Sequence, residues 1–429
     1  MKKLFVLILF ISISISCFAQ PKINPKEVER IIKTLSSDDM MGRKTFTPGI
    51  EKASAFIQSE FEKSGLKPLS DLSNFEQKFN LFSLKPIESE ILLNESPVDA
   101  ENYFFSTSNE SISWNEFSKT EIFFISEKAN LWQSYNEIKK KNVDAIVLVN
   151  SKHQKMFSNF KKYFGSGSMY EELGKDKSQV YILADSVQVN FIKIKLVNQV
   201  ETKSLSNVAG MIPGKRGNEF VVFSAHYDHL GYIRPVDGDS IANGADDDAS
   251  GTTAVISLAD YYSKLPQPER TLIFVCFTAE EMGGYGSRYF SKQLNPDQIT
   301  AMFNIEMIGK PSKFGPNTAF ITGFEKSDFG KILQKAVKKS AYKFYPDPYP
   351  DQNLFYRSDN ATLARLGVPA HSISSDQIDK DKLYHSVDDE FKSLNMPHMT
   401  NMIKAIAVGS KSIVDGKETP KRVEKSDVE

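Results

Sequence analysis

From Asn207 onward, short apolar runs alternate with stretches whose apolar residues recur at helical spacing. The apolar runs cover residues 219–225, 271–278, 302–307, 319–322 and 370–374. The helical stretches cover residues 250–265, 330–340 and 360–366. Strands that alternate with helices are typical of βαβ units, in which helices cover a parallel sheet. We therefore predict an α/β fold for residues 204–415, with a mostly parallel central sheet and helices on both faces.

Polar residues gather where these predicted strands end. The segment 226–229 follows the first strand directly, 279–283 follows the second, and the acidic loop 243–251 precedes a predicted helix. Open α/β sheets bind their ligands beyond the carboxyl ends of the strands. Glu306 lies near the end of the predicted strand 302–307, and two more polar residues lie near the C-terminus. We expect all these side chains to meet at one edge of the sheet: His226, Asp228, Asp247, Glu280, Glu281, Glu306, Tyr384 and His385.

These residue types suit metal-assisted hydrolysis. Cleaving an amide at neutral pH requires an activated water, a polarised carbonyl and a proton carrier, and zinc supplies the first two. Nitrogen and oxygen ligands bind zinc well. Each residue alone has a common structural explanation; an acidic pair after a strand, for example, often starts a helix. The ordered set favours a metal site with the ligands His226, Asp247, Glu281, Glu306 and His385.

The same segments resemble motifs of the M28 family of zinc peptidases, which includes bacterial aminopeptidases. The motifs lie at residues 225–228, 244–251, 278–283, 303–309 and 384–385, and the resemblance covers about residues 27–66 and 205–411. It implies an aminopeptidase that acts on peptides or proteins with two zinc ions. His226 and Glu306 would bind one ion, Glu281 and His385 the other, and Asp247 both.

The resemblance also implies roles for residues that bind no metal. Glu280 would be the general base and then the acid for the leaving amine, Asp228 would orient His226, and Tyr384 would stabilise the oxyanion. A cis peptide bond is implied between Asp247 and Asp248.

Two positions depart from the family pattern. The family usually has aspartate where this chain has Glu306, and residues 357–360 match a motif that often has histidine after Asp359, which we interpret as structural. His229 has no matching ligand role, and we expect it near the site, where it could contact substrate.

Three other functions fit parts of this pattern. A carboxypeptidase or dipeptidase could share the scaffold, since specificity would depend on the loops 231–241 and 347–357. A glutaminyl-cyclase-like acyltransferase would hold a single zinc ion, and the pair His226 and Asp228 argues against it. A non-catalytic binding protein would not need Glu280 and all the predicted ligands.

The rest of the chain divides by its character. Residues 20–84 are predicted to be an N-terminal part of the peptidase domain, and residues 85–203, which hold both tryptophans and none of the motifs, an inserted domain. The insert resembles a protease-associated domain. Residues 416–429 are charged and predicted to be disordered.

The N-terminus reads as an export signal. Lys2 and Lys3 precede an apolar run over residues 4–15, which is too short for a membrane span, and Ala19 is a suitable cleavage residue. We predict a signal peptide over residues 1–19 and a periplasmic or secreted protein; a lipoprotein anchored at Cys17 is the alternative. Cleavage would leave Cys276 as the single cysteine, which excludes an intramolecular disulfide. The net charge of −1 argues against a nucleic-acid partner. The oligomeric state stays open.

Overall fold

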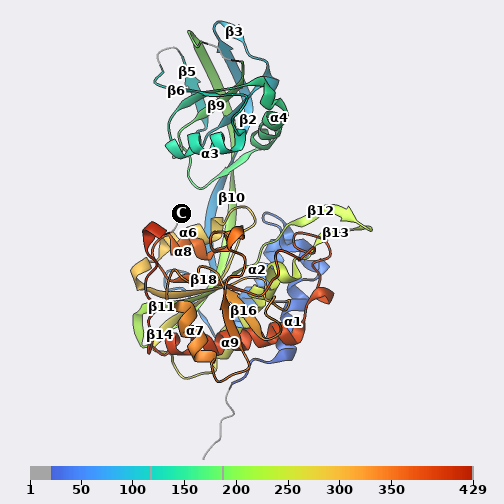
Figure 1. The fold of residues 1–429 in the computed structure, drawn as a ribbon, viewed down its shortest axis with the longest axis vertical. Helices are drawn as coiled ribbons and strands as arrows, with labels where there is room; N and C mark the ends of the chain where they lie inside the picture. The colour runs from blue at the N-terminus through green and yellow to red at the C-terminus, as the bar shows by residue number, and fades with distance from the viewer. Residues whose placement is uncertain (1–20, 116–117, 186–187, 428–429) are drawn as a thin grey trace, which may run out of the picture.

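The computed structural model describes residues 21–427 except 116–117 and 186–187, so the predicted signal peptide and Cys17 lie outside the described residues. Two lobes are joined by a pair of long strands (Figure 1). We call residues 86–198 the second lobe and the remaining described residues the main lobe.

The central sheet of the main lobe is mostly parallel, as predicted. Four neighbouring strands run in the same direction: β18 (Ala370–Ser374), β15 (Ile299–Ile305), β11 (Arg216–His226) and β14 (Arg270–Phe277). Beyond β18, the strands β16 (Thr318–Ile321) and β17 (Lys343–Pro346) are parallel to each other and antiparallel to β18. At the other side, β10 (Ile192–Ile212) pairs antiparallel with β14 and with β2 (Glu76–Leu93).

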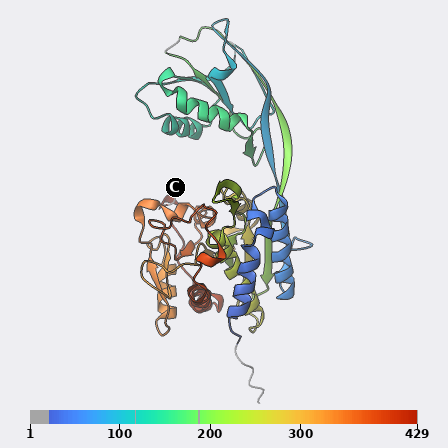
Figure 2. The same cartoon turned by 90° about the vertical axis from the view of Figure 1, so that its right-hand side faces the viewer.

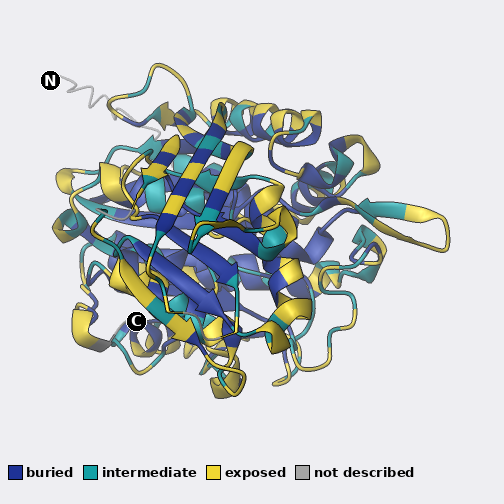
Figure 3. Ribbon diagram, turned by 90° about the horizontal axis from the view of Figure 1, so that it is seen from above, coloured by how far each residue is buried: buried dark blue, intermediate teal, exposed yellow. Residues whose placement is uncertain are grey.

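Helices cover both faces of this sheet, which confirms the predicted α/β class. Successive residues of a strand point to opposite faces, and β14 shows this: Leu272, Phe274 and Cys276 belong to one core, while Ile273, Val275 and Phe277 belong to the other. The first core is covered by α1 (Pro25–Leu35), α2 (Pro48–Lys63), α5 (Gly251–Ser263), α7 (Phe329–Val337) and α9 (Met396–Val414). The second is covered by α6 (Tyr285–Gln293) and α8 (Asn360–Ala364). Figure 3 shows the buried central strands in dark blue.

The second lobe has its own four-stranded sheet. Its strands are β4 (Tyr103–Ser106), β9 (Gln179–Leu183), β7 (Ala145–Val149) and β6 (Glu121–Ile125), and α3 (Leu131–Lys141) and α4 (Gln154–Gly165) accompany them. The predicted domain limits at residues 85 and 203 fall inside β2 and β10, which pair from Glu76 with Val208 to Leu93 with Ile192. The domain division and the likeness to a protease-associated domain stay predictions.

Short strands complete the structure. They are β1 (Lys67–Pro68), β3 (Ser96–Pro97), β5 (Ser111–Trp114), β8 (Ser168–Tyr170) and the hairpin of β12 (Gly231–Val236) and β13 (Asp239–Ala242). Within the described ranges, we find no helix of the length and apolarity that a membrane crossing requires.

Strand direction decides where the site lies. β10 runs from the second lobe into the main lobe, so β14, which is antiparallel to it, points back toward the second lobe. Because β11, β15 and β18 are parallel with β14, their carboxyl ends also point that way. In the side view of Figure 2 the second lobe arches above this end of the main lobe.

The C-terminal segment is ordered up to residue 427, which corrects the prediction of disorder for residues 416–427. The main-chain NH of Val423 donates to the oxygen of Gly367, and the Val423 side chain is buried. The Arg270 side chain donates to the main-chain oxygen of Glu418. These contacts join segments distant in sequence, so the charge of the segment did not reveal them.

Candidate active site

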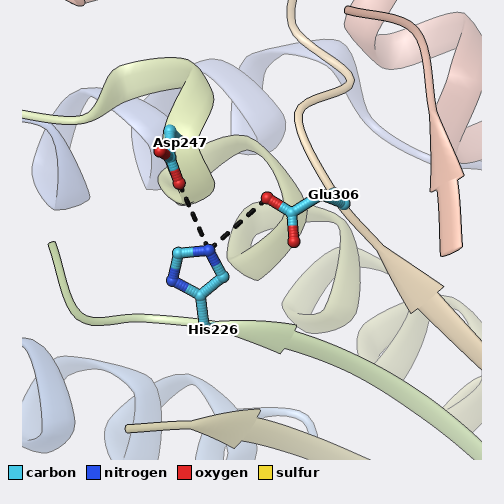
Figure 4. Close-up of side chains that lie close together, drawn as sticks. All are labelled: His226, Asp247 and Glu306. Carbon is cyan, nitrogen blue, oxygen red and sulfur yellow. Dashed lines mark ion pairs between the residues drawn. The ribbon is translucent and has the colours of Figure 1, made fainter. Parts of the chain in front are cut away.

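Three predicted ligands meet at the ends of two strands and the start of a helix. His226 is the last residue of β11, Glu306 directly follows β15, and Asp247 lies in the irregular helical turn η4 (Ala245–Ser250) before α5. The Nε2 atom of His226 is 3.2 Å from Oδ1 of Asp247 and 3.5 Å from Oε1 of Glu306 (Figure 4). Each residue offers one ligand atom, and these atoms lie within 4.8 Å of one another.

A second cluster shares Asp247 with the first. Oδ2 of Asp247 is 3.2 Å from Nε2 of His385, and this nitrogen is 3.3 Å from Oε2 of Glu281. The two carboxylate oxygens of Asp247 therefore face different groups of ligands. The structure brings together all five predicted ligands, and the peptide bond between Asp247 and Asp248 is cis.

His229 is a member of the second cluster, whereas the sequence predicted it only near the site. Its Nδ1 is 2.8 Å from Oε1 of Glu281 and 3.9 Å from Oδ2 of Asp247, and the ring is buried. Gly244 makes room for this ring: a Cβ atom there would lie 2.5 Å from the imidazole. The only sequence signal for His229 is its position three residues after His226.

Asp228 contacts the ring of His226 with its main chain and the Glu280–Glu281 loop with its carboxylate. Nδ1 of His226 is 3.1 Å from the main-chain oxygen of Asp228 and 3.7 Å from its Oδ1. The carboxylate accepts hydrogen bonds from the main-chain NH groups of Glu280 and Glu281, at 3.1 and 3.3 Å. Asp228 thus orients the histidine through its backbone and holds the Glu280–Glu281 loop through its side chain.

Arg43 fixes the loops beneath the clusters. Its buried guanidinium donates to the main-chain oxygens of Tyr227 and Gly244, at 2.8 and 2.9 Å. These oxygens belong to the two loops that present His226 and Asp247. None of the motifs in the sequence includes Arg43, so this role was not predicted. Glu306 is held in a similar way, because the Ser358 hydroxyl donates to its Oε2 at 2.6 Å.

Burial and clustering shift the pKa values of several side chains in the site. Burial raises the pKa of Asp228 to about 7. Hydrogen bonds to Asp247 and Glu281 raise the pKa of His385 to about 10. Burial also holds the pKa of Glu280 well above its usual range. Neighbouring carboxylates raise each other's pKa because like charges disfavour ionisation. The site therefore carries buried negative charge that cations would balance, and its imidazole and carboxylate donors fit zinc.

A small cavity of about 80 Å³ lies beside the clusters. Glu280 and Tyr384 line it, as do the apolar side chains Met307, Phe320, Leu354 and Ile378. The Tyr384 ring stacks on His385, and burial raises the pKa of its phenol, which therefore stays protonated. Of the two predicted specificity loops, 347–357 reaches this wall, whereas 231–241 supplies none of the lining among the described residues.

Comparisons with known proteins find similar sequences and similar folds. Residues 207–409 match the model of peptidase family M28. The leucine aminopeptidase 1 of Pyrenophora tritici-repentis is 29% identical over 212 residues, which cover 45% of this chain and 52% of that protein. The leucine aminopeptidase 1 of Ajellomyces capsulatus is 30% identical over 214 residues, covering 46% of this chain and 53% of that protein. The chain thus spans about half the length of these curated relatives.

Solved structures resemble the fold of nearly the whole chain. A zinc aminopeptidase from Bacillus subtilis has a TM-score of 0.55 at 14% identity and covers 96% of this chain and 99% of its own. An aminopeptidase from Aneurinibacillus sp. strain AM-1 has a TM-score of 0.53 at 17% identity, with 91% and 94% covered. Fold and site define an α/β protein with a cluster of metal-ligand residues at the strand ends. Over residues 207–409, the chain is similar to peptidase family M28.

Proposed function

We propose that this protein is a zinc-dependent aminopeptidase that removes N-terminal residues from peptides. The observation that carries the proposal is the placement of Asp247, whose two carboxylate oxygens face separate ligand clusters. His226 and Glu306 would hold one zinc ion and Glu281 and His385 the other. Zinc ions at this site would lower the pKa of water to about 7 and polarise the substrate carbonyl.

The remaining steps fall to side chains in the cavity. The Glu280 carboxylate, in the same wall as the ligands, would accept the proton of the attacking water and deliver it to the departing amine nitrogen. Its raised pKa suits a group that must both take and return a proton. The Tyr384 hydroxyl would donate a hydrogen bond to the oxyanion as it forms.

The names of the relatives support an aminopeptidase over a carboxypeptidase or a dipeptidase. The test compares peptides that have a free N-terminus with the same peptides acetylated there, with zinc present and after its removal by a chelator. We expect release of the first residue from free peptides only, with two zinc ions per chain. Release of the last residue would indicate a carboxypeptidase, and one zinc ion with cyclised N-terminal glutamine would indicate the cyclase-like alternative.

We also infer that the chain is exported and that residues 1–19 are its signal peptide. The charged start, the apolar run and Ala19 support this inference. N-terminal sequencing of the protein recovered from its native cells should begin at Gln20. A chain that retains Met1, or a lipid on Cys17, would contradict the cleavage proposed here.

A further inference from the structure

An aromatic hollow of about 620 Å³ lies on the second lobe, between α3, α4 and β8. Its wall includes Trp132, Tyr135, Phe160, Tyr163, Phe164 and Tyr285. Trp132 is 58% exposed and Tyr163 66%, although such large side chains are usually covered. Exposed aromatic groups on a concave wall mark a surface suited to a partner, because they add large contact areas at a low entropic cost.

Tyr285 links the hollow to the loop that carries Glu280 and Glu281, because its main-chain NH donates to the oxygen of Ala279 at 3.1 Å. This residue belongs to the main lobe, four positions after Glu281, and its hydroxyl donates to the main-chain oxygen of Met169 at 3.0 Å. The carboxyl ends of the central strands point toward the second lobe, and α3 and α4 lie on the side of that lobe that faces them (Figures 1 and 2). A peptide held by its N-terminus at the ligand clusters would leave the cavity in this direction.

One positive charge lies in the wall of the hollow, and the two helices that form this wall are basic. Together α3 and α4 carry six lysines and one glutamate, whereas the whole chain has a net charge of −1. Lys139 lines the hollow itself and lies 5.8 Å from the centre of the Tyr135 ring. Basic groups beside an aromatic wall complement a segment that combines apolar or aromatic side chains with acidic ones.

We propose that this hollow binds the downstream part of a polypeptide substrate, several residues after the scissile bond, and selects segments with aromatic and acidic side chains. The proposal rests on the peptidase function proposed above. It makes the protein an enzyme for peptides or unfolded chains rather than for dipeptides. The second lobe supplies affinity, and the main lobe supplies the ligand clusters.

The test compares two substrates with the same first two residues: a dipeptide amide and a peptide of about 15 residues, which spans roughly 50 Å when extended. The longer peptide carries phenylalanine, tryptophan and glutamate in its second half. The variant replaces both exposed rings, Trp132→Ala with Tyr163→Ala. The control is Phe124→Ala, which removes a ring that is 47% exposed on β6 of the second lobe and does not line the hollow.

We expect the long peptide to have a KM about tenfold below that of the dipeptide amide, and the double variant to abolish this difference. The dipeptide amide should be cleaved equally by all three proteins. Equal KM values for both substrates in the unmodified protein, or a double variant that weakens both alike, would overturn the proposal. If sedimentation shows that the double variant dissociates a dimer, the occupant is a second copy and the proposal is wrong.

Binding separates this proposal from the peptidase function. The anisotropy of the fluorescein-labelled long peptide is measured with the unmodified protein and with the double variant, after zinc removal so that no turnover occurs. Binding that the double variant loses supports the hollow even if neither substrate is cleaved. Cleavage of the dipeptide amide without such a difference in binding supports the peptidase function alone.

Discussion

Glu280 and Glu281 are neighbours in the chain but have different surroundings. Glu281 lies within 3.3 Å of both His229 and His385, whereas Glu280 lines the cavity and has a raised pKa. We expect Glu280→Gln to keep zinc content and KM and to lower kcat by about 10²–10⁴-fold, because glutamine cannot carry a proton. Glu281→Gln should instead lose zinc and recover part of its activity in excess zinc. Loss of zinc from Glu280→Gln would mean that ligand and base are exchanged.

His229 positions a predicted ligand rather than the substrate. Its Nδ1 is 2.8 Å from Oε1 of Glu281, on the side away from His385. Groups that orient metal ligands commonly contribute 10–100-fold to metal affinity. We therefore expect His229→Asn to weaken binding of one of two zinc ions by about that factor, measured by competition with a chromophoric chelator. His153→Asn, in the second lobe, is the matched control. Unchanged affinity at both sites would contradict this role.

His371 should make the fold sensitive to acid. Burial lowers its pKa from 6.5 to about 4, so below pH 6.5 the unfolded chain takes up a proton that the folded chain does not. The free energy of unfolding then falls as the pH drops from 6.5 to 4, by about 2 kcal/mol at pH 5 from this group. Urea unfolding at pH 7.5 and pH 5 should show a smaller loss for His371→Gln than for the unmodified protein. Equal losses would show that His371 does not contribute.

The strands β2 and β10 connect the lobes without a break. Lys85 faces Gln199 in their antiparallel register, close to the irregularity between Val197 and Asn198. Replacing residues 86–198 by Asn-Gly, a sequence that favours tight hairpin turns, should close this pair and remove the second lobe. Because no residue of the ligand clusters lies in the deleted segment, we expect a folded protein that binds two zinc ions and cleaves short peptides. Loss of zinc binding in a folded deletion variant would contradict the separation of the lobes.

Residues near the C-terminus supply hydrogen-bond acceptors to the buried side chain of Arg270. The Arg270 side chain is 2% exposed, pairs with Glu219 at 2.7 Å, and donates to the Glu418 oxygen and to Oγ1 of Thr419. Ending the chain after Gly416 removes the last two acceptors and leaves a buried cation with too few partners. We expect the free energy of unfolding to fall by about 2–4 kcal/mol in urea. A chain that ends after Glu424 keeps these contacts and serves as the control. If both truncations lowered the free energy of unfolding equally, the loss of the Arg270 partners would not be the cause.

The sequence by itself determined the class of fold and the predicted ligands. Strand and helix periods are local properties, so the alternation after Asn207 was sufficient to predict a mostly parallel sheet. Such a sheet gathers the residues that follow its strands at one edge. For this reason the neighbours of His226, Asp247 and Glu306 could be predicted although the three are distant in sequence.

Only the tertiary structure decided which groups support those ligands and the rest of the main lobe. Arg43 bonds to the oxygen of Tyr227, 184 residues away, and Arg270 to the oxygen of Glu418, 148 residues away. His229 turns toward Glu281 because Gly244 leaves space for its ring. Such contacts depend on how loops from separate segments pack, and no local period records that packing. The predicted ligands therefore lie in short motifs that can be recognised in the sequence, whereas the rigidity of the site comes from long-range hydrogen bonds.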